Sequence, residues 1–155
     1  MAIAVFCSAN SFSQGGFKFG GGLSLGTEAD AGDAGIGISP RAAYIINEDF
    51  TVASNFTYWF TDSDITFWAL NADLHYTFAG DESLSFYGLA GLNYSNYDID
   101  FEESYNGIGN ISISGSDSEI GLNIGAGANM GMFFGEIKYE TTYDGQLVLS
   151  AGVLF

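Results

Sequence analysis

Four things are scarce in this sequence: basic residues, proline, cysteine and long apolar runs. Lysine and arginine together number 3, against 19 aspartates and glutamates, and the formal net charge is −16. Nucleic acid is excluded as a partner, because too few cations are present to neutralise its phosphates. With one proline and no fixed glycine period, the 22 glycines do not describe a collagen-like or proline-rich chain.

The missing apolar runs exclude one kind of membrane protein. No stretch approaches the roughly 18 consecutive apolar residues that a membrane-spanning helix requires. The chain is nevertheless 47% hydrophobic and 16% aromatic, so it is not an acidic disordered segment, which would lack aromatics. Its 155 residues are enough for one folded domain.

The single cysteine lies near the beginning of the chain. The first 14 residues, MAIAVFCSANSFSQ, combine a short apolar run with small and polar residues, which resembles the second half of a secretory signal peptide. We therefore expect residues 1–14 to be a signal-peptide remnant and residues 15–155 to be the folded domain. Cleavage would remove Cys7 and leave a mature protein without disulfides. Phe6 is too bulky for Cys7 to be a lipoprotein acceptor.

What the sequence has in abundance is alternation of apolar and polar residues. In GFKFGGGLSLG, Phe17, Phe19 and Leu23 fall on one face and Lys18 falls on the other. Eight such segments follow one another, each about 10–14 residues long, which is the length of a tilted strand that crosses a membrane. They are GFKFGGGLSLG, IGISPRAAYIIN, FTVASNFTYWFT, ITFWALNADLHYTF, LSFYGLAGLNYSNY, EIGLNIGAGANMG, FFGEIKYETT and QLVLSAGVLF.

The connections between these segments alternate in length. NED, GDES and MGM are typical of tight turns, whereas TEADAGDAG, TDSD, TTYDG and the stretch 98–118 are longer. An even number of antiparallel strands, with short turns at one end and longer loops at the other, is typical of an outer-membrane barrel. The predicted fold is all-β: an eight-stranded antiparallel up-and-down transmembrane β-barrel.

Charge placement indicates which face is inside. All three basic residues and three acids fall on the polar face, and the other 16 acids fall in loops and turns. A soluble barrel such as a lipocalin has its apolar face inside and many charges outside. Here the polar face is electrically balanced and rich in glycine, serine, threonine and asparagine, as a crowded bore requires. We expect a lumenal charge cluster of Lys18, Arg41, Asp73, His75, Glu136, Lys138 and Glu140.

Two stretches carry a family resemblance. ISPRAAYIINEDFTV combines a proline, a basic residue, small residues, an aromatic and an acidic turn, and the C-terminal alternation stops at Phe155. Both resemble the small OmpA/OmpX-type outer-membrane β-barrel family (the outer membrane protein beta-barrel domain), over residues 15–155. The resemblance implies a multi-pass β-barrel in the cell outer membrane of a Gram-negative bacterium, in contact with lipid and lipopolysaccharide. It also implies that Phe155 is an assembly signal read by the barrel-assembly machinery during insertion.

The only histidine, His75, lies two residues after Asp73 on the same face. This pair suits either a proton relay or a hydrogen-bonded polar plug, and its position toward the short-turn end favours the plug. The glycine runs do not lead from a strand into a helix, so a phosphate-binding loop is not expected. No catalytic residue, cofactor or metal site is predicted.

The long third loop is acidic. A divalent-cation site is one reading of its carboxylates, and a solvated acidic surface is the commoner one. The stretch IDFEESYNGIGNISIS keeps some alternation, which predicts that two strands continue beyond the membrane as a hairpin whose edge is open to a partner strand. The candidate partner-binding residues are Asp98, Asp100, Glu102, Glu103, Tyr105, Asp117 and Glu119.

These features predict a non-enzymatic integral outer-membrane protein. Its polar, charged lumen would be plugged, because eight strands leave a bore that side chains just fill. Its role would be structural, or partner binding through acidic extracellular loops, alone or as a subunit of a larger envelope complex. Two alternatives stay open: a narrow porin or transport channel for small solutes and, with less support, a lipid-modifying enzyme.

Overall fold

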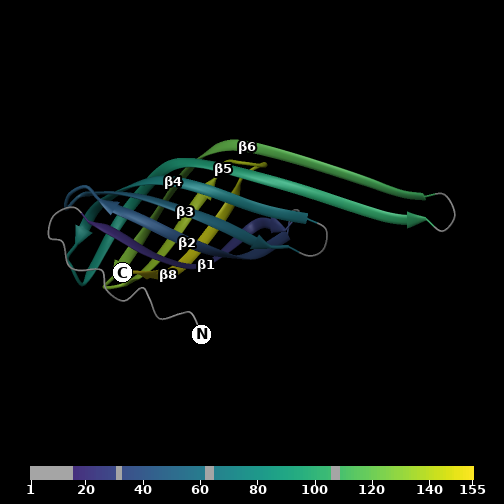
Figure 1. Ribbon diagram of the computed structural model, residues 1–155. Helices are drawn as coiled ribbons and strands as arrows, with labels where there is room; N and C mark the ends of the chain where they lie inside the picture. The colour runs from purple at the N-terminus through teal and green to yellow at the C-terminus, as the bar shows by residue number, and fades with distance from the viewer. Residues whose placement is uncertain (1–15, 31–32, 62–64, 106–108) are drawn as a thin grey trace, which may run out of the picture.

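Eight strands form a closed antiparallel barrel in the computed structural model, in the order β1 to β8 (Figure 1). The structure describes residues 16–30, 33–61, 65–105 and 109–155, apart from the side chains of residues 30 and 100–114. Each strand pairs with its neighbours in the chain, and β8 returns to pair with β1. The predicted eight-stranded up-and-down barrel is confirmed. The strands are β1 (Phe17–Asp30), β2 (Asp33–Ile45), β3 (Phe50–Phe60), β4 (Ile65–Gly80), β5 (Leu84–Tyr105), β6 (Gly109–Met130), β7 (Phe133–Glu140) and β8 (Gln146–Leu154).

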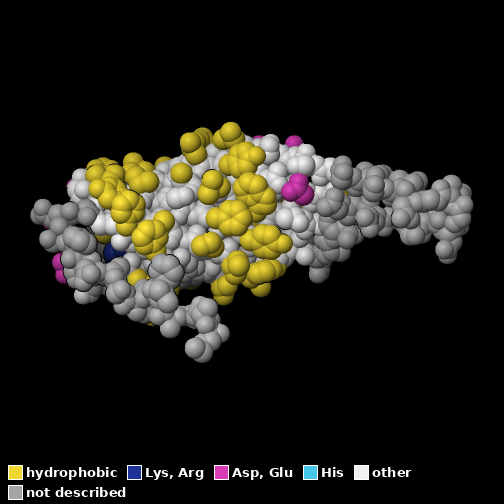
Figure 2. Space-filling view, viewed as in Figure 1, with side chains coloured by type: hydrophobic (Ala, Val, Ile, Leu, Met, Phe, Trp, Pro, Cys, Tyr) yellow, Lys and Arg dark blue, Asp and Glu magenta, His cyan; other side chains and the backbone are white. Residues whose placement is uncertain are grey.

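Burial alternates along the strands and shows which face is outside. In β3, nearly every second residue is buried and the residues between are exposed, which is the period of two that a strand imposes. Outward residues are apolar: Phe19 is 55% exposed and Leu122 60% exposed, whereas the inward Asn71 and Asn93 are fully buried. On the face of the barrel seen in Figure 2, apolar side chains cover much of the wall, and acidic side chains lie toward its ends. The sidedness predicted from charge placement is confirmed.

The short connections gather at one end of the barrel, which we call the turn end. Asn47 Oδ1 accepts the backbone N–H groups of Asp49 and Phe50 in the β2–β3 turn, at 3.0 and 2.8 Å. Asp81 Oδ1 accepts two backbone N–H groups in the β4–β5 turn. These two hydrogen bonds favour the ionised carboxylate and hold the pKa of Asp81 below its usual range. The β6–β7 turn uses Gly131 in the left-handed region, with φ of 61°.

At the opposite end, the loop end, two strands outgrow the rest. Strands β5 and β6 have 22 residues each, against 8 in β7. They stay paired without a shift of register as far as Tyr105↔Gly109. Pairing with β4 stops at Ile99, and pairing with β7 stops at Asn123, so beyond these points the β5–β6 hairpin projects from the barrel (Figure 1). The hairpin predicted from IDFEESYNGIGNISIS is confirmed.

Pro40 lies inside β2, where its missing N–H removes a ladder hydrogen bond. The pairing of β2 with β3 is interrupted between Ile38↔Tyr58 and Arg41↔Asn55, and it resumes in the same register. The proline therefore leaves a local gap and does not shift the strands. None of the described residues belongs to an apolar helix long enough to cross a membrane.

Candidate functional site

The inward side chains form a polar network across the bore, which begins with hydroxyl groups. Ser24 Oγ shares hydrogen bonds of 2.7 Å with Ser39 Oγ and 2.8 Å with Ser150 Oγ, and Ser39 Oγ lies 2.8 Å from Thr57 Oγ1. All four residues are buried. Side chains inside the barrel therefore join four neighbouring strands, β8, β1, β2 and β3, in addition to the backbone ladder.

The part of the network nearer the turn end centres on Glu136. Arg41 donates to both of its carboxylate oxygens, at 3.0 Å and 2.8 Å, and the Tyr87 hydroxyl donates to Oε2 at 2.9 Å. His75 stacks on Tyr87 with ring centroids 4.4 Å apart, and the Arg41 guanidinium lies 4.3 Å above the Phe134 ring. The bidentate pair is the strong form of an arginine–carboxylate contact. We call Arg41, His75, Tyr87 and Glu136 the Glu136 group.

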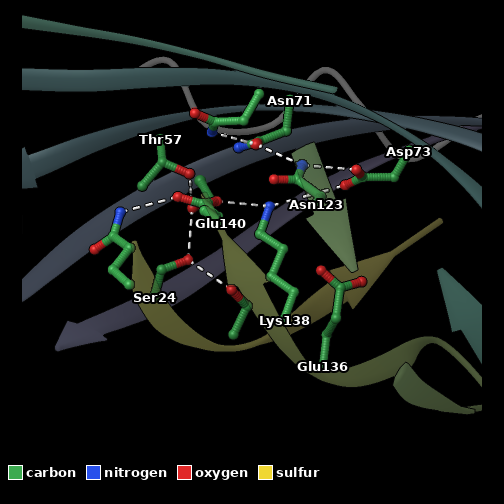
Figure 3. Close-up of polar contacts among 12 residues, drawn as sticks. Ser24, Thr57, Asn71, Asp73, Asn123, Glu136, Lys138 and Glu140 are labelled. Carbon is green, nitrogen blue, oxygen red and sulfur yellow. Dashed lines mark hydrogen bonds and ion pairs between the residues drawn. The ribbon is translucent and has the colours of Figure 1, made fainter. Parts of the chain in front are cut away.

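The next part of the network centres on Lys138. Its Nζ lies between two carboxylates, 3.0 Å from Glu140 Oε1 and 3.8 Å from Asp73 Oδ2 (Figure 3). Gln146 Nε2 donates to Glu140 at 2.9 Å, and Asn123 Nδ2 donates to Asp73 at 2.8 Å. A buried cation without an acceptor would be strongly destabilising, and here two acidic residues of different strands supply one each.

Amide groups carry the network toward the loop end. Asn71 Oδ1 accepts from Asn123 Nδ2 at 2.9 Å and from Asn93 Nδ2 at 2.7 Å. Asn93 Oδ1 in turn accepts from the hydroxyls of Ser95, at 2.6 Å, and Thr142, at 2.8 Å. Both asparagines are fully buried. Their uncharged groups bridge the bore without adding charge to a low-dielectric interior.

Glycine makes room for these large inward side chains. A Cβ at Gly125 would lie 2.7 Å from Cβ of Lys138, and a Cβ at Gly127 would lie 2.5 Å from the Tyr87 hydroxyl oxygen. Any other residue at either position would collide with the network. Glycine at these positions therefore relieves crowding in the bore.

An aromatic lid, formed by Trp59, Phe67, Tyr97 and Tyr143, covers the network at the loop end. The rings of Trp59 and Phe67 are stacked at 6.1 Å, and Tyr97 and Tyr143 contact Phe67 at 4.9 and 6.2 Å. Trp59 and Phe67 are 1% and 2% exposed. The lid was not predicted from the sequence, because neither Trp59 nor Phe67 was assigned to a face. The available signal was position: Trp59 has the parity of the inward Thr57.

The β7–β8 turn fastens this lid to the base of the hairpin. Tyr143 and Asp144 are both in the left-handed region, with φ of 49° and 67°. The Tyr143 hydroxyl donates to the backbone carbonyls of Ser95 and Asp117, at 3.2 and 2.9 Å, and its N–H donates to the Glu119 carboxylate at 2.9 Å. Burial, followed by the charges of Asp117 and Glu119, raises the pKa of Tyr143 to about 12.

The turn end of the bore is open. A cavity of about 580 Å³ lies there, and Lys18, Arg41, His75 and Tyr87 are among its lining residues. Three of these, Arg41, His75 and Tyr87, are buried members of the Glu136 group at the cavity floor, whereas Lys18 is half-buried on the wall. The loop end of the bore is therefore covered by aromatic rings, whereas the turn end opens into a polar cavity.

The structure brings six of the seven predicted lumenal residues together and leaves Lys18 apart from them. Lys18 forms no ion pair with any residue that the structure describes. The buried part of the bore thus holds two cations, one histidine and three carboxylates. The third cation of the predicted charge balance, Lys18, lies at the cavity wall instead. The six are Arg41, Asp73, His75, Glu136, Lys138 and Glu140.

The other predicted positions that the structure describes lie outside the bore. Asp117 and Glu119 are exposed on β6 and Asp98 is half-buried on β5. Residues 1–14 with Cys7, and the side chains of Asp100, Glu102, Glu103 and Tyr105, lie outside the described residues. Phe155 is 56% exposed and exchanges two backbone hydrogen bonds with Phe19. Within the described residues, no group of three or more His, Cys, Asp or Glu side chains is placed to hold a metal ion.

Comparisons with known proteins agree with this architecture. The family model described as "Outer membrane protein beta-barrel domain" matches residues 3–143. The N-terminal β-barrel domain of Pseudomonas aeruginosa OprF is 19% identical, with a TM-score of 0.60 over 92% of this chain and 98% of that chain. Yersinia pestis Ail is 25% identical, with a TM-score of 0.54 over 91% and 97%. Neisserial surface protein A is 18% identical, with a TM-score of 0.60 over 92% and 98%. No curated protein matches in sequence.

Proposed function

The chain belongs to the outer membrane protein beta-barrel domain family, and on that basis we propose that it is a non-enzymatic barrel whose bore is closed to solutes and whose β5–β6 hairpin binds a partner outside the membrane. In barrels of this kind the short turns face the periplasm and the longer loops face outward. The observation that carries the proposal is the length of β5 and β6, which far exceeds what the barrel wall uses.

The closed bore is supported by the burial of its side chains. Three polar layers lie one after another along the bore: the Glu136 group, the Lys138 contacts, and the asparagine chain formed by Asn71, Asn93 and Asn123. The aromatic lid covers them. A solute would have to break hydrogen bonds in several layers to pass. An eight-stranded barrel has an interior that side chains are just able to fill.

The hairpin offers a free strand edge. Leu122, at its base, directs both its N–H and its C=O toward β7, where Thr141 contacts them. Because the direction of these groups alternates along a strand, Ser116 and Ser118 direct theirs toward the same side, where no described strand pairs with them. Unpaired edges of this kind accept an added strand.

The charge of the hairpin indicates the chemistry of the partner. Residues 96–119 contain six acidic residues and no lysine or arginine. A structure of Ail contains a heparin analogue, sucrose octasulfate, which is a polyanion. Such a ligand would be repelled here, because like charges would face each other. We therefore expect an extended partner segment that carries lysine or arginine.

The test uses the full chain in lipid nanodiscs and an alternating lysine–valine octapeptide as the probe. Proline at both Ser116 and Ser118 removes edge N–H donors without removing bonds to β5, so we expect peptide binding to fall at least tenfold. Alanine at the same two positions keeps the N–H groups and is the matched control. Equal binding by the two variants would refute the proposed edge.

A second measurement tests the closed bore. Planar bilayers that contain the protein should show no sustained single-channel steps, whereas a narrow channel would show them. His75→Ala should leave the lipid A of the host membrane unchanged in mass, whereas a lipid-modifying enzyme with His75 in its site would lose its product.

A further inference from the structure

The cavity at the turn end has the size and shape of a small-molecule site. Its volume of about 580 Å³ lies within the range of roughly 300–1,000 Å³ that is typical of ligand pockets. Exposure falls from the mouth inward: Asp81 and Glu82 in a turn are exposed, Thr51 and Thr77 are half-buried, and the floor residues Arg41, His75 and Tyr87 are buried. The cavity is therefore a blind recess, open only toward the turn end.

Two buried polar atoms in the lining have no partner. Nε2 of His75 forms no hydrogen bond with a described residue, and the Glu136 Oε2 atom lies 3.9 Å away from it. Nε of Arg41 also has no hydrogen-bond partner, although both terminal nitrogens of the guanidinium are paired. The His75 and Arg41 side chains are only 8% and 2% exposed. Buried polar groups in native proteins are normally satisfied, so these two leave places for an acceptor.

Charge along the cavity is arranged with opposite signs at two depths. The wall carries the amino group of Lys18, which has no ion pair with a described residue, and the floor carries the Arg41 guanidinium. The rim carries the carboxylates of Glu48, Asp81 and Glu82. An anionic group is favoured in the interior and a cationic group is favoured at the rim, because each would then face the opposite charge.

We propose that this cavity binds a small amino carboxylate, with its carboxylate near Lys18 and the free Nε of Arg41 and its ammonium group at the acidic rim. His75 Nε2 supplies a further hydrogen bond. The inference is independent of the proposed function of the hairpin, because it concerns the other end of the barrel. Its failure would leave the strand-edge proposal intact, and the reverse also holds.

The binding test compares three probes of equal chain length: γ-aminobutyrate, butyrate and butylamine. His75 is the only histidine, so with isotope label confined to histidine its ring C–H resonances in an NMR spectrum report on the cavity floor alone. At constant pH and ionic strength, we expect saturable shifts with γ-aminobutyrate, at millimolar affinity for a ligand of this size. Butyrate should bind more weakly, and butylamine should give no saturable shift.

Variants separate a site in this cavity from a general effect on the protein. Lys18→Met should weaken γ-aminobutyrate binding about tenfold, because it removes a charge-assisted contact. Ser118→Asp, at the hairpin, gives the same net charge and should not. Ser85→Trp fills the cavity and should abolish the shift, whereas Ser83→Trp, in the adjacent turn outside the lining, should preserve it.

Three results would overturn the proposal. The first is the absence of a saturable shift with either γ-aminobutyrate or butyrate, which would mean that the cavity holds water alone. The second is a shift with butylamine equal to that with γ-aminobutyrate. The third is unchanged γ-aminobutyrate binding in both Lys18→Met and Ser85→Trp.

Discussion

The two ends of the bore differ, because one is covered by side chains and the other is open. At the loop end, Trp59 and Phe67 point inward and stack, and the bore is covered by apolar rings. At the turn end, the inward residues of the neighbouring strands are Ala43, Ala53 and Thr51, and a cavity remains. Strand number sets one radius for the whole barrel. The volume of the inward side chains therefore decides where the bore is filled and where it stays open.

The polar layers between the two ends experience different surroundings. The asparagine chain lies beneath the aromatic lid, where Asn71 accepts hydrogen bonds from Asn93 and Asn123, and where Asn71 Nδ2 and Asn123 Oδ1 have no partner among the described residues. The Glu136 group faces the cavity, and it retains polar atoms without partners. Both layers thus contain buried polar atoms without partners among the described residues, and those of Arg41 and His75 belong to residues that line the cavity at the open end.

The largest effect is expected at the turn end, from Glu136→Ala. This change leaves the buried Arg41 guanidinium without its carboxylate, and we expect a loss of about 4 kcal/mol in the free energy of unfolding. Urea unfolding in lipid vesicles is the measurement. The double variant Arg41→Met, Glu136→Leu removes both charges and should recover more than half of the loss. A double variant as unstable as the single one would show that the ion pair itself is not the source.

A somewhat smaller effect is expected at the loop end, from Trp59→Ala. The lid would lose its most deeply buried ring, at about 3 kcal/mol. The chain provides its own control, since the other tryptophan, Trp68, lies on the outer face between Phe56 and Tyr94. Trp68→Ala should cost less than half as much in the same unfolding assay. If the outer tryptophan proved the more important, the lid would not be what stabilises this end.

A third test weakens the fastening between the lid and the hairpin. Tyr143→Phe removes the hydroxyl that bonds to Ser95 and Asp117, and we expect a loss of about 1 kcal/mol near pH 9. Because the folded-state pKa of about 12 lies above the ordinary tyrosine value, this contribution is complete below pH 10 and disappears as pH rises through 12. Unfolding of wild type and variant at both pH values should show the difference vanish. A difference that persists at pH 12 would contradict the assignment.

The smallest effect is expected in the turn beside the cavity, from Asp81→Asn. The folded-state pKa of Asp81 is lowered, so ionised Asp81 stabilises the fold above its ordinary pKa, and this contribution is lost as pH falls through the lowered value. Asparagine keeps an acceptor for the two turn N–H groups. The melting temperatures should therefore differ slightly at pH 7, and this difference should shrink as the pH is lowered below the ordinary pKa of aspartate. Asp144→Asn, at the loop end, is the control for removal of one exposed charge.

The sequence was sufficient to predict the strands and their faces, because successive residues of a strand point to opposite faces and the alternation of apolar and polar residues can be seen in the sequence. Phe19 and Leu122 face outward, and Arg41 and Glu136 face inward, as alternation predicts. Depth along the bore could not be predicted in this way. Lys18 pairs with Ala43, two residues away from Arg41 on β2, and this stagger places the lysine on the cavity wall and the arginine at its floor.

The inward aromatic residues of the loop end were not predicted. Aromatic residues are common on the lipid-facing side of such barrels, and no face was assigned to Trp59 or Phe67, although their parity is that of the inward residues. The cavity was also beyond sequence reasoning. It depends on small inward residues of several strands, such as Ala43 and Ala53, that meet only in the closed barrel.

The pairing of β1 with β8 has a consequence for how the molecule is made. Leu23 meets Ala151 and Phe19 meets Phe155, so the sheet has one seam at which the most distant parts of the described chain join. Until that seam closes, two long edges carry unpaired backbone groups that hydrocarbon cannot satisfy. Contacts this far apart in sequence form slowly. Insertion and closure must therefore finish together, and a nascent barrel that stalls before β8 arrives would aggregate through its open edges.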